Sequence, residues 1–275
     1  MKSITSNSKT ILVPTDFSDN ALKALEYASY LAIEIGAKVL LLNAYQIPAG
    51  TSNLMINFSD IIEKDSKDAL HDLIVKMTTQ DAFKKVNYEG ISCYGYLTEA
   101  MDITTKNRTI DLIVMGTTGA STVKNKLLGS NTVDVIKKTS IPLVVIPNEV
   151  EYKGWNHIIL ASNIDNNVQT AVAALSNIID IENIEIDILA VENEVNAEAI
   201  DHTNLIKNLN GWHYQFRTEQ NENIVDGIVE YSESHDSDLI VILKKSYSFI
   251  ERIVHKSVTN KMALHTKKPL FLLKV

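Results

Sequence analysis

One short sequence pattern occurs twice in the chain, and a proline follows each copy at the same distance. Asp111-Leu-Ile-Val recurs as Asp238-Leu-Ile-Val, and Pro142 and Pro269 each lie 31 residues after the aspartate. Other matches accompany it: Ser130 and Thr132 recur as Ser257 and Thr259, and the apolar pair Ile11-Leu12 has a counterpart in Ile158-Ile159. The repetition predicts an internal duplication, in which two stretches of the chain fold to the same plan.

The first half alternates short apolar segments with segments whose apolar residues recur at helical spacing. Strands are predicted at residues 11–13, 38–42, 86–94, 112–115 and 143–146, helices at 21–35, 59–77, 98–106 and 130–138, and a loop at 48–57. Ser18 or Asp19 is the expected N-cap of the first helix, and Gly36 its end. Apolar strands separated by helices indicate an α/β fold, a doubly wound parallel sheet covered on both faces.

A short polar stretch, residues 148–154, separates the two copies, and the strand pattern resumes at 157–160. Such a stretch is typical of a domain boundary. We therefore predict two domains, at residues 1–148 and 155–275, each with a parallel sheet of its own.

The composition limits the classes of function. With 275 residues, of which 45% are hydrophobic, the chain can build a large core. Its formal net charge of -8 argues against DNA, RNA or an anionic membrane as partner, since these attract basic surfaces. Cys93 is the only cysteine, and the seven histidines show no metal-ligand spacing, so neither a disulfide nor a metal site is expected. Residues 1–10 are polar and no apolar run is long enough to span a bilayer, so we expect a cytoplasmic protein.

The strongest local signal is Gly116-Thr-Thr-Gly119, followed after nine residues by Gly129-Ser-Asn-Thr132. Glycines allow positive φ and close approach of a ligand, and free N–H groups at Gly129 to Thr132 would favour an anion such as phosphate at the start of a helix. A tight turn and a helix entry are an equally good explanation of these glycines taken alone.

A second segment favours a ligand site. Pro14-Thr15-Asp16 follows the first predicted strand, where a doubly wound sheet places its ligand crevice. Asp16 can accept hydrogen bonds from a ribose or a base, although it can also cap the next helix. Two segments about 100 residues apart would meet only where the strand order reverses.

These residues resemble the universal stress protein family. The resemblance rests on Ile11-Leu-Val-Pro-Thr-Asp-Phe-Ser18, on the glycine spacing and on Ile141-Pro-Leu-Val-Val145, and it is clear over residues 9–148 and weaker over 155–275. It implies a five-stranded parallel sheet in the order 3-2-1-4-5 in each of two tandem domains. The glycine spacing is associated with the branch of the family that binds ATP.

The resemblance also implies a ligand site in the first domain. The ligand would be ATP, with AMP or ADP as alternatives, and Mg²⁺ would accompany its phosphates. The implied residues are Pro14, Thr15 and Asp16 near the adenosine, Ala44 beside the adenine, Met115 and Gly116 as lining residues, and Gly119, Gly129, Ser130, Asn131 and Thr132 at the phosphates.

The second half departs from this pattern. Leu243, Ser246 and Lys256 replace the three glycines, and Ala161, Ser162 and Asn163 replace the segment that ends in Asp16. Side chains at former glycine positions fill the space that a phosphate needs, so we predict that the second half has lost the site.

Three functions are compatible with these features. The first is a nucleotide-binding stress or signalling module with little or no hydrolysis, because no dedicated general base is apparent. The second is an interaction scaffold without nucleotide, in which the glycines serve packing. The third, phosphotransfer or adenylyl transfer, is the weakest, because the histidine signature of nucleotidylyl transferases is absent and no P-loop occurs.

The duplication also predicts an assembly. Single-domain relatives pair through sheet edges, so the two domains of this chain are expected to form an intramolecular pseudo-dimer through residues 143–146 and 270–273. A further homodimer is then optional, and no protein partner is identified by the sequence.

Overall fold

The computed structural model describes residues 8–47, 55–119, 129–161, 168–180, 182–192, 212–244 and 267–274, and all structural statements below concern these residues. The first half contains β1 (Thr10–Pro14), α1 (Asp19–Ile35), β2 (Lys38–Tyr45), α2 (Met55–Thr78), β3 (Tyr88–Tyr94), α3 (Leu97–Asn107), β4 (Leu112–Gly116), α4 (Ser130–Lys138) and β5 (Leu143–Ile146). The second half contains β6 (His157–Ala161), α5 (Val168–Ser176), β7 (Glu185–Glu192), β8 (His213–Gln220), α6 (Ile224–Ser234), β9 (Leu239–Lys244) and β10 (Leu270–Lys274).

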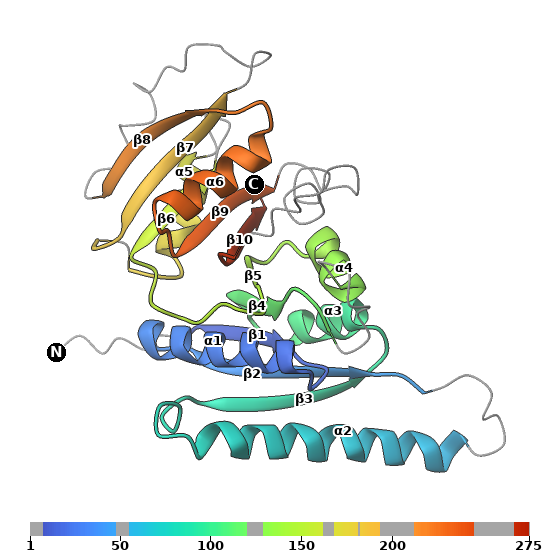
Figure 1. Ribbon diagram of the computed structural model, residues 1–275. Helices are drawn as coiled ribbons and strands as arrows, with labels where there is room; N and C mark the ends of the chain where they lie inside the picture. Colours follow the sequence, from blue (N-terminus) through green and yellow to red (C-terminus); the bar gives the residue numbers. More distant parts are fainter. Residues whose placement is uncertain are drawn as a thin grey trace.

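The strands form one ten-stranded sheet in the order β3-β2-β1-β4-β5-β10-β9-β6-β7-β8. The predicted α/β class and the order 3-2-1-4-5 of the first half are confirmed, and the second half repeats this order from the opposite edge. All strand pairs are parallel except β5 and β10, which pair antiparallel with Val144 opposite Phe271. The two predicted edge segments pair with each other, so the five strands of each half form one continuous sheet (Figure 1).

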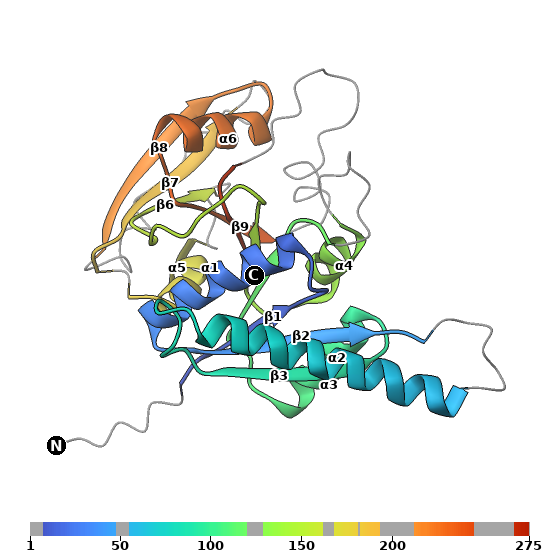
Figure 2. The same ribbon diagram turned by 60° about the horizontal axis from the view of Figure 1, so that its bottom comes forward.

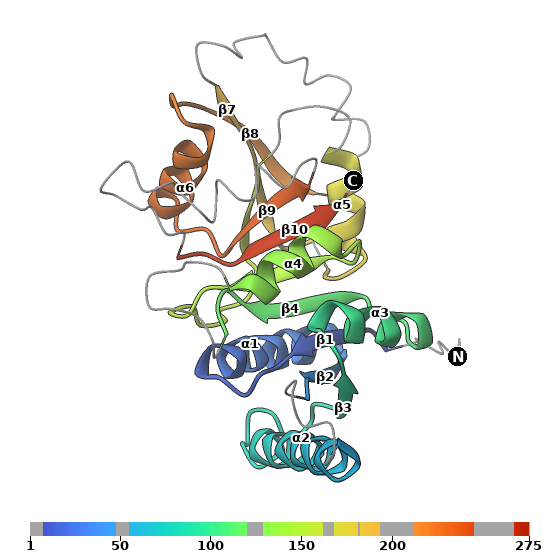
Figure 3. The same cartoon turned by 90° about the vertical axis from the view of Figure 1, so that its right-hand side faces the viewer.

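The helices cover both faces of this sheet. Residues of α1, α2 and α5 pack on one face, and residues of α3, α4 and α6 pack on the other. Figure 2 shows α1 and α2 in front of the strands of the first half, and Figure 3 shows α5 and α6 on opposite sides of the second-half strands. Neighbouring strand residues such as Leu12 and Val13 are fully buried on opposite faces, which explains why the strands read as continuous apolar runs.

The helix boundaries follow local signals in the sequence. The Ser18 hydroxyl accepts a hydrogen bond from the Ala21 N–H and caps α1, and Gly36 ends that helix with a φ of 65°. The expected loop over 48–57 is too long, because α2 already begins at Met55. The helix-breaking residues of that segment are Pro48 and Gly50, so nothing stops a helix from starting before Ser59.

The repeated pattern has a structural role that is the same in both halves. The Asp111 carboxylate accepts the Thr10 N–H at 2.8 Å, and the Asp238 carboxylate accepts the His157 N–H at 3.0 Å. Each aspartate therefore fixes the start of the first strand of its half against the fourth. The repeated prolines act alike, since the carbonyls of Pro142 and Pro269 accept N–H groups of Ile113 and Ile240 at 2.9 and 3.0 Å.

We expect Asp111→Ala and Asp238→Ala each to lower the free energy of unfolding by about 2 kcal/mol. Each change leaves a strand N–H without its charged acceptor, and such hydrogen bonds contribute about 1.5–3 kcal/mol. Chemical denaturation measures the effect. The exposed Asp102 on α3 provides the matched control, for which Asp102→Ala should change stability by less than about 0.5 kcal/mol; equal effects at all three positions would contradict this role.

The segment between the halves packs against α1. Trp155 is 2% exposed, donates its indole N–H to the Tyr27 hydroxyl at 2.6 Å and lies against Phe271 of β10. Tyr152 contacts the Tyr27 ring edge-on. Residues of both halves belong to one buried apolar cluster on this face, so the halves share part of their core.

Candidate functional site

A cavity of about 300 Å³ lies at the carboxyl ends of the first-half strands. β1 and β4 are neighbours in the sheet, but the helices that follow them, α1 and α4, lie on opposite faces of it. Doubly wound folds usually bind their ligand at this reversal of the strand order. All the predicted site residues line it: Pro14, Thr15, Asp16, Ala44, Met115, Gly116, Gly119, Gly129, Ser130, Asn131 and Thr132. The cavity has the size of a small-ligand site.

The loop after β1 is shaped by Thr15. Its N–H donates to the Leu42 carbonyl at 2.9 Å, its carbonyl accepts from the Asn43 side chain at 2.8 Å, and its hydroxyl accepts the Phe17 N–H at 3.1 Å. Phe17 has a φ of 63°, which is uncommon for a residue other than glycine.

Asp16 does not cap α1, because Ser18 does so. One Asp16 carboxylate oxygen, Oδ1, accepts the Ser18 N–H at 3.1 Å and the Ser18 hydroxyl at 2.6 Å. These bonds orient the carboxylate at the cavity wall. The Asp16 side chain thus has a position suited to accepting hydrogen bonds from a ligand, and the alternative of a helix cap is excluded by the geometry.

Close approach, and not positive φ, explains the glycines after β4. A Cβ at Gly116 would lie 3.0 Å from the Asn20 carbonyl oxygen, and a Cβ at Gly119 would lie 2.5 Å from Asp16 Oδ2. The described glycines with positive φ are Gly36, Gly95 and Gly154, and Gly129 has a φ of -69°. Of the two uses of glycine considered from the sequence, positive φ therefore does not apply at these positions.

The start of α4 faces the same cavity. The Gly129 N–H donates to the Thr117 carbonyl at 2.7 Å, so the expectation that it is free is corrected. The Thr132 hydroxyl donates to the Gly116 carbonyl at 3.0 Å and ties the helix to β4. The N–H groups of Ser130, Asn131 and Thr132 belong to the first turn, where helical geometry provides no acceptor, and Gly129 has no side chain to supply one. N–H groups at a helix start favour an anion, so this end of the cavity is suited to one.

The opposite end of the cavity includes residues that sequence reasoning missed. Gln46 follows β2, Gly95 and Tyr96 connect β3 to α3, and Leu97 is the first residue of α3. The sequence did contain a sign of these residues, namely the order of the strands. Because β3 lies beside β2 in a parallel sheet, the loop after β3 also reaches the cavity. The further lining residues are Ala21 and Thr118.

The charges at the cavity are few. Among the described lining residues Asp16 alone carries a formal charge at neutral pH. Lys124 and Lys126, in the spacer between Gly119 and Gly129, lie outside the described residues. No group of three His, Cys, Asp or Glu side chains suited to a metal ion occurs in the described parts of the chain.

The matching region of the second half is described only in part. Leu243, which replaces Gly116, is 9% exposed, and Ala161, which replaces Pro14, is 6% exposed. Ser162, Asn163, Ser246, Lys256, Ser257 and Thr259 lie outside the described residues. A buried leucine at the position of a cavity glycine agrees with the predicted loss of the site and does not test it.

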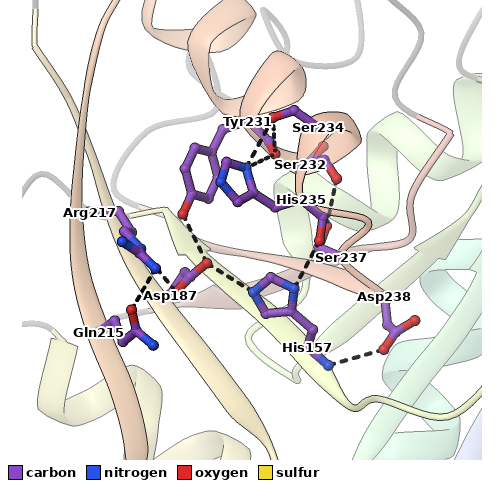
Figure 4. A network of polar contacts seen from close by, with 10 residues as sticks. All are labelled: His157, Asp187, Gln215, Arg217, Tyr231, Ser232, Ser234, His235, Ser237 and Asp238. Atoms are coloured by element: carbon purple, nitrogen blue, oxygen red, sulfur yellow. Dashed lines mark hydrogen bonds and ion pairs between the residues drawn. The ribbon is translucent and has the colours of Figure 1, made fainter.

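The second half instead has a buried polar network at the amino ends of its strands (Figure 4). Asp187 is 6% exposed, and its Oδ2 lies 2.9 Å from His157 Nε2 and 2.9 Å from the Tyr231 hydroxyl. Arg217 lies 3.6 Å from the other oxygen. Burial and the neighbouring Asp187 raise the pKa of Tyr231, which keeps its hydroxyl a hydrogen-bond donor. Because every member has a partner, the network serves to hold β6, β7 and α6 together.

Comparison with known proteins identifies one family. A model described as the universal stress protein family matches residues 7–147. A universal stress protein of Methanocaldococcus jannaschii is 31% identical over 144 residues, which cover 50% of this chain and 81% of that protein. One from Mycobacterium tuberculosis is 27% identical over 147 residues, which cover 50% of this chain and 95% of that protein.

A solved structure resembles both halves together. The crystal structure of a universal stress protein from Archaeoglobus fulgidus has a TM-score of 0.67 and 17% identity, and the match covers 98% of this chain and 99% of that one. This likeness is one of fold. In the described residues no helix is long and apolar enough to cross a membrane.

Proposed function

The chain belongs to the universal stress protein family, and from this premise we propose that its first half, residues 1–148, binds an adenine nucleotide. ATP is the principal candidate, with ADP and AMP as shorter alternatives and Mg²⁺ on the phosphates. The second half, residues 155–275, is proposed to have lost the equivalent site.

The observation that carries this proposal is convergence. Segments around Asp16, Ala44, Gly116 and Ser130 are far apart in the sequence and line one cavity at the reversal of strand order. The cavity combines a carboxylate with the free first-turn N–H groups of a helix. These are groups that accept hydrogen bonds from a ribose and bind the charge of a phosphate.

The same geometry favours binding without rapid turnover. Asp16 is the one carboxylate in the described lining, and its Oδ1 is already engaged by Ser18. Hydrolysis requires an oriented and activated water, and a carboxylate that is held against its own loop is suited to hold a ligand. We therefore propose a stress-response signalling module of the cytoplasm in place of an enzyme.

A scaffold without nucleotide is the second candidate, and one observation favours it. Gly116 and Gly119 each lie so close to Asn20 or Asp16 that the fold requires glycine even without a ligand. In that case the motif would keep β4 close to the start of α1, and the protein would act through its surface alone.

Calorimetric titration of the full chain with ATP and Mg²⁺ distinguishes these candidates. We expect one site per chain, because only the first half has the cavity residues. Two sites would contradict the proposed loss in the second half. A folded protein that releases no heat with ATP, ADP or AMP would favour the scaffold.

The pairing of β5 with β10 supports a proposal about assembly. We propose that the two halves form an intramolecular pseudo-dimer through this pair, in which Leu270 lies opposite Val145. The apolar edges that a single domain would expose are thereby covered within one chain. A further homodimer is then not needed for stability, and sedimentation of the purified protein would detect one.

A further inference from the structure

We propose that Tyr96 stacks on the base of the bound nucleotide, so that the site favours a ligand with a base over a bare polyphosphate. The inference rests on the proposed function and adds a base-contacting residue to it. It starts from the placement of Tyr96 in the loop between β3 and α3, where it lines the cavity with 65% of its side chain exposed.

The base end of the cavity follows from the sheet order. The anion-binding N–H groups of α4 follow β4, while Tyr96 follows β3, and the two strands are three positions apart in the order β3-β2-β1-β4. At about 4.8 Å per strand this separation is about 14 Å. A nucleotide whose phosphates lie at Ser130 therefore extends its base toward Ala44 and Tyr96.

The backbone of the loop before α3 is held in a fixed conformation. Gly95 has a φ of 123°, and a Cβ there would lie 2.9 Å from the Glu99 carboxylate. The Gly95 N–H donates to the Tyr45 carbonyl at 2.9 Å, and the Glu99 carboxylate accepts the Tyr96 N–H at 3.1 Å. This turn fixes the backbone at the cavity wall and requires glycine before the tyrosine.

The identity of residue 96 is unusual for its position. Tyr96 is the N-cap of α3, a position that favours Ser, Thr, Asp or Asn, and its side chain makes no cap hydrogen bond. A local preference that is broken at a cavity wall marks a functional position. The exposed Tyr96 ring at this end of the cavity provides an aromatic face for stacking, and such faces stack on any nucleotide base.

Tyr94 provides a matched comparison. It is a second tyrosine of the same edge, 60% exposed, two residues before Tyr96, but it is not among the residues that line the cavity. Its ring contacts Tyr45 edge-on at 5.9 Å between centroids. Loss of Tyr94 should therefore leave the ligand unaffected.

The test compares ATP with inorganic tripolyphosphate, which has no base, in calorimetric titrations of the full chain. We expect Tyr96→Ala to weaken ATP affinity by roughly tenfold, the size of one base stack, and to change tripolyphosphate affinity by less than about twofold. Tyr96→Phe and Tyr94→Ala should bind ATP like the wild type. Ethenoadenosine triphosphate should show stacking as quenched emission in the wild type and less quenching in Tyr96→Ala.

A stability measurement separates stacking from a structural role. Because serine is a favourable N-cap, Tyr96→Ser should raise the midpoint of thermal unfolding by roughly 2 °C while it weakens ATP binding. Wild-type ATP affinity in Tyr96→Ala, or equal weakening for ATP and tripolyphosphate, would overturn the stacking role and leave the proposed function intact. No binding of ATP by the folded wild type would overturn both.

Discussion

We expect Gly116→Leu to show no ATP binding in calorimetric titrations, at ligand concentrations that saturate the wild type. A Cβ at this position would lie 3.0 Å from the Asn20 carbonyl oxygen and 3.3 Å from its carbon, and neither backbone atom can move without shifting the start of α1. A leucine side chain also occupies cavity volume at the end of β4. The change copies Leu243 of the second half, so it tests whether this one residue is sufficient to remove a site.

A second variant keeps this result interpretable if Gly116→Leu folds poorly. Ser130 is exposed at the first position of α4, where a carboxylate interacts favourably with the helix dipole. Ser130→Asp should therefore fold at least as stably as the wild type. Like charges a few ångströms apart at a partly screened site repel by about 1–4 kcal/mol, so we expect roughly 100-fold weaker ATP binding.

The charge of the ligand provides the decisive comparison. Adenosine has no phosphate, and its affinity should be the same in Ser130→Asp and the wild type. Gly90→Ala on β3 is the matched glycine control, since a Cβ there meets Ile74 and Leu70 side chains at an ordinary 3.4 Å. Retained ATP affinity in both Gly116→Leu and Ser130→Asp, with both proteins folded, would place the nucleotide elsewhere.

The sequence predicted most of the fold because its elements end at strong local signals. Ser18, Gly36 and the prolines before β5 and β10 fix boundaries by caps and by backbone geometry, which act within a few residues. The joining of the two sheets is a long-range property. The only local sign of it is that the segments of β5 and β10 are too apolar for exposed edges.

The sequence predicted those parts of the candidate site that follow the carboxyl ends of strands at the reversal of strand order. Asp16 and Ser130 follow adjacent strands at the reversal of order, so their meeting could be inferred once the family resemblance implied the order 3-2-1-4-5. The role of Tyr96 could not, because an aromatic N-cap matches no nucleotide motif. The physical reason for Gly116 was also hidden, since a sequence does not distinguish a positive φ from the close approach of Asn20.

Trp155→Ala should have the largest effect on stability of any single substitution considered for this chain. We expect a loss of about 3–5 kcal/mol in the free energy of unfolding, as for other large buried aromatic side chains replaced by alanine. Trp155 is 2% exposed and fills the space between α1 and β10. Its removal also leaves the Tyr27 hydroxyl, whose pKa is raised by burial, without the indole donor.

The consequence concerns how the halves unfold. Because Trp155 belongs to the cluster shared by both halves, the wild type should unfold in one transition in urea, and Trp155→Ala in two. Trp155→Phe keeps most of the packing and loses the hydrogen bond, so it should cost less and keep one transition. Trp212, which is only partly buried beside the same cluster, is the control, and Trp212→Ala should leave a single transition. A single unchanged transition in Trp155→Ala would show that the β5–β10 pair alone couples the halves.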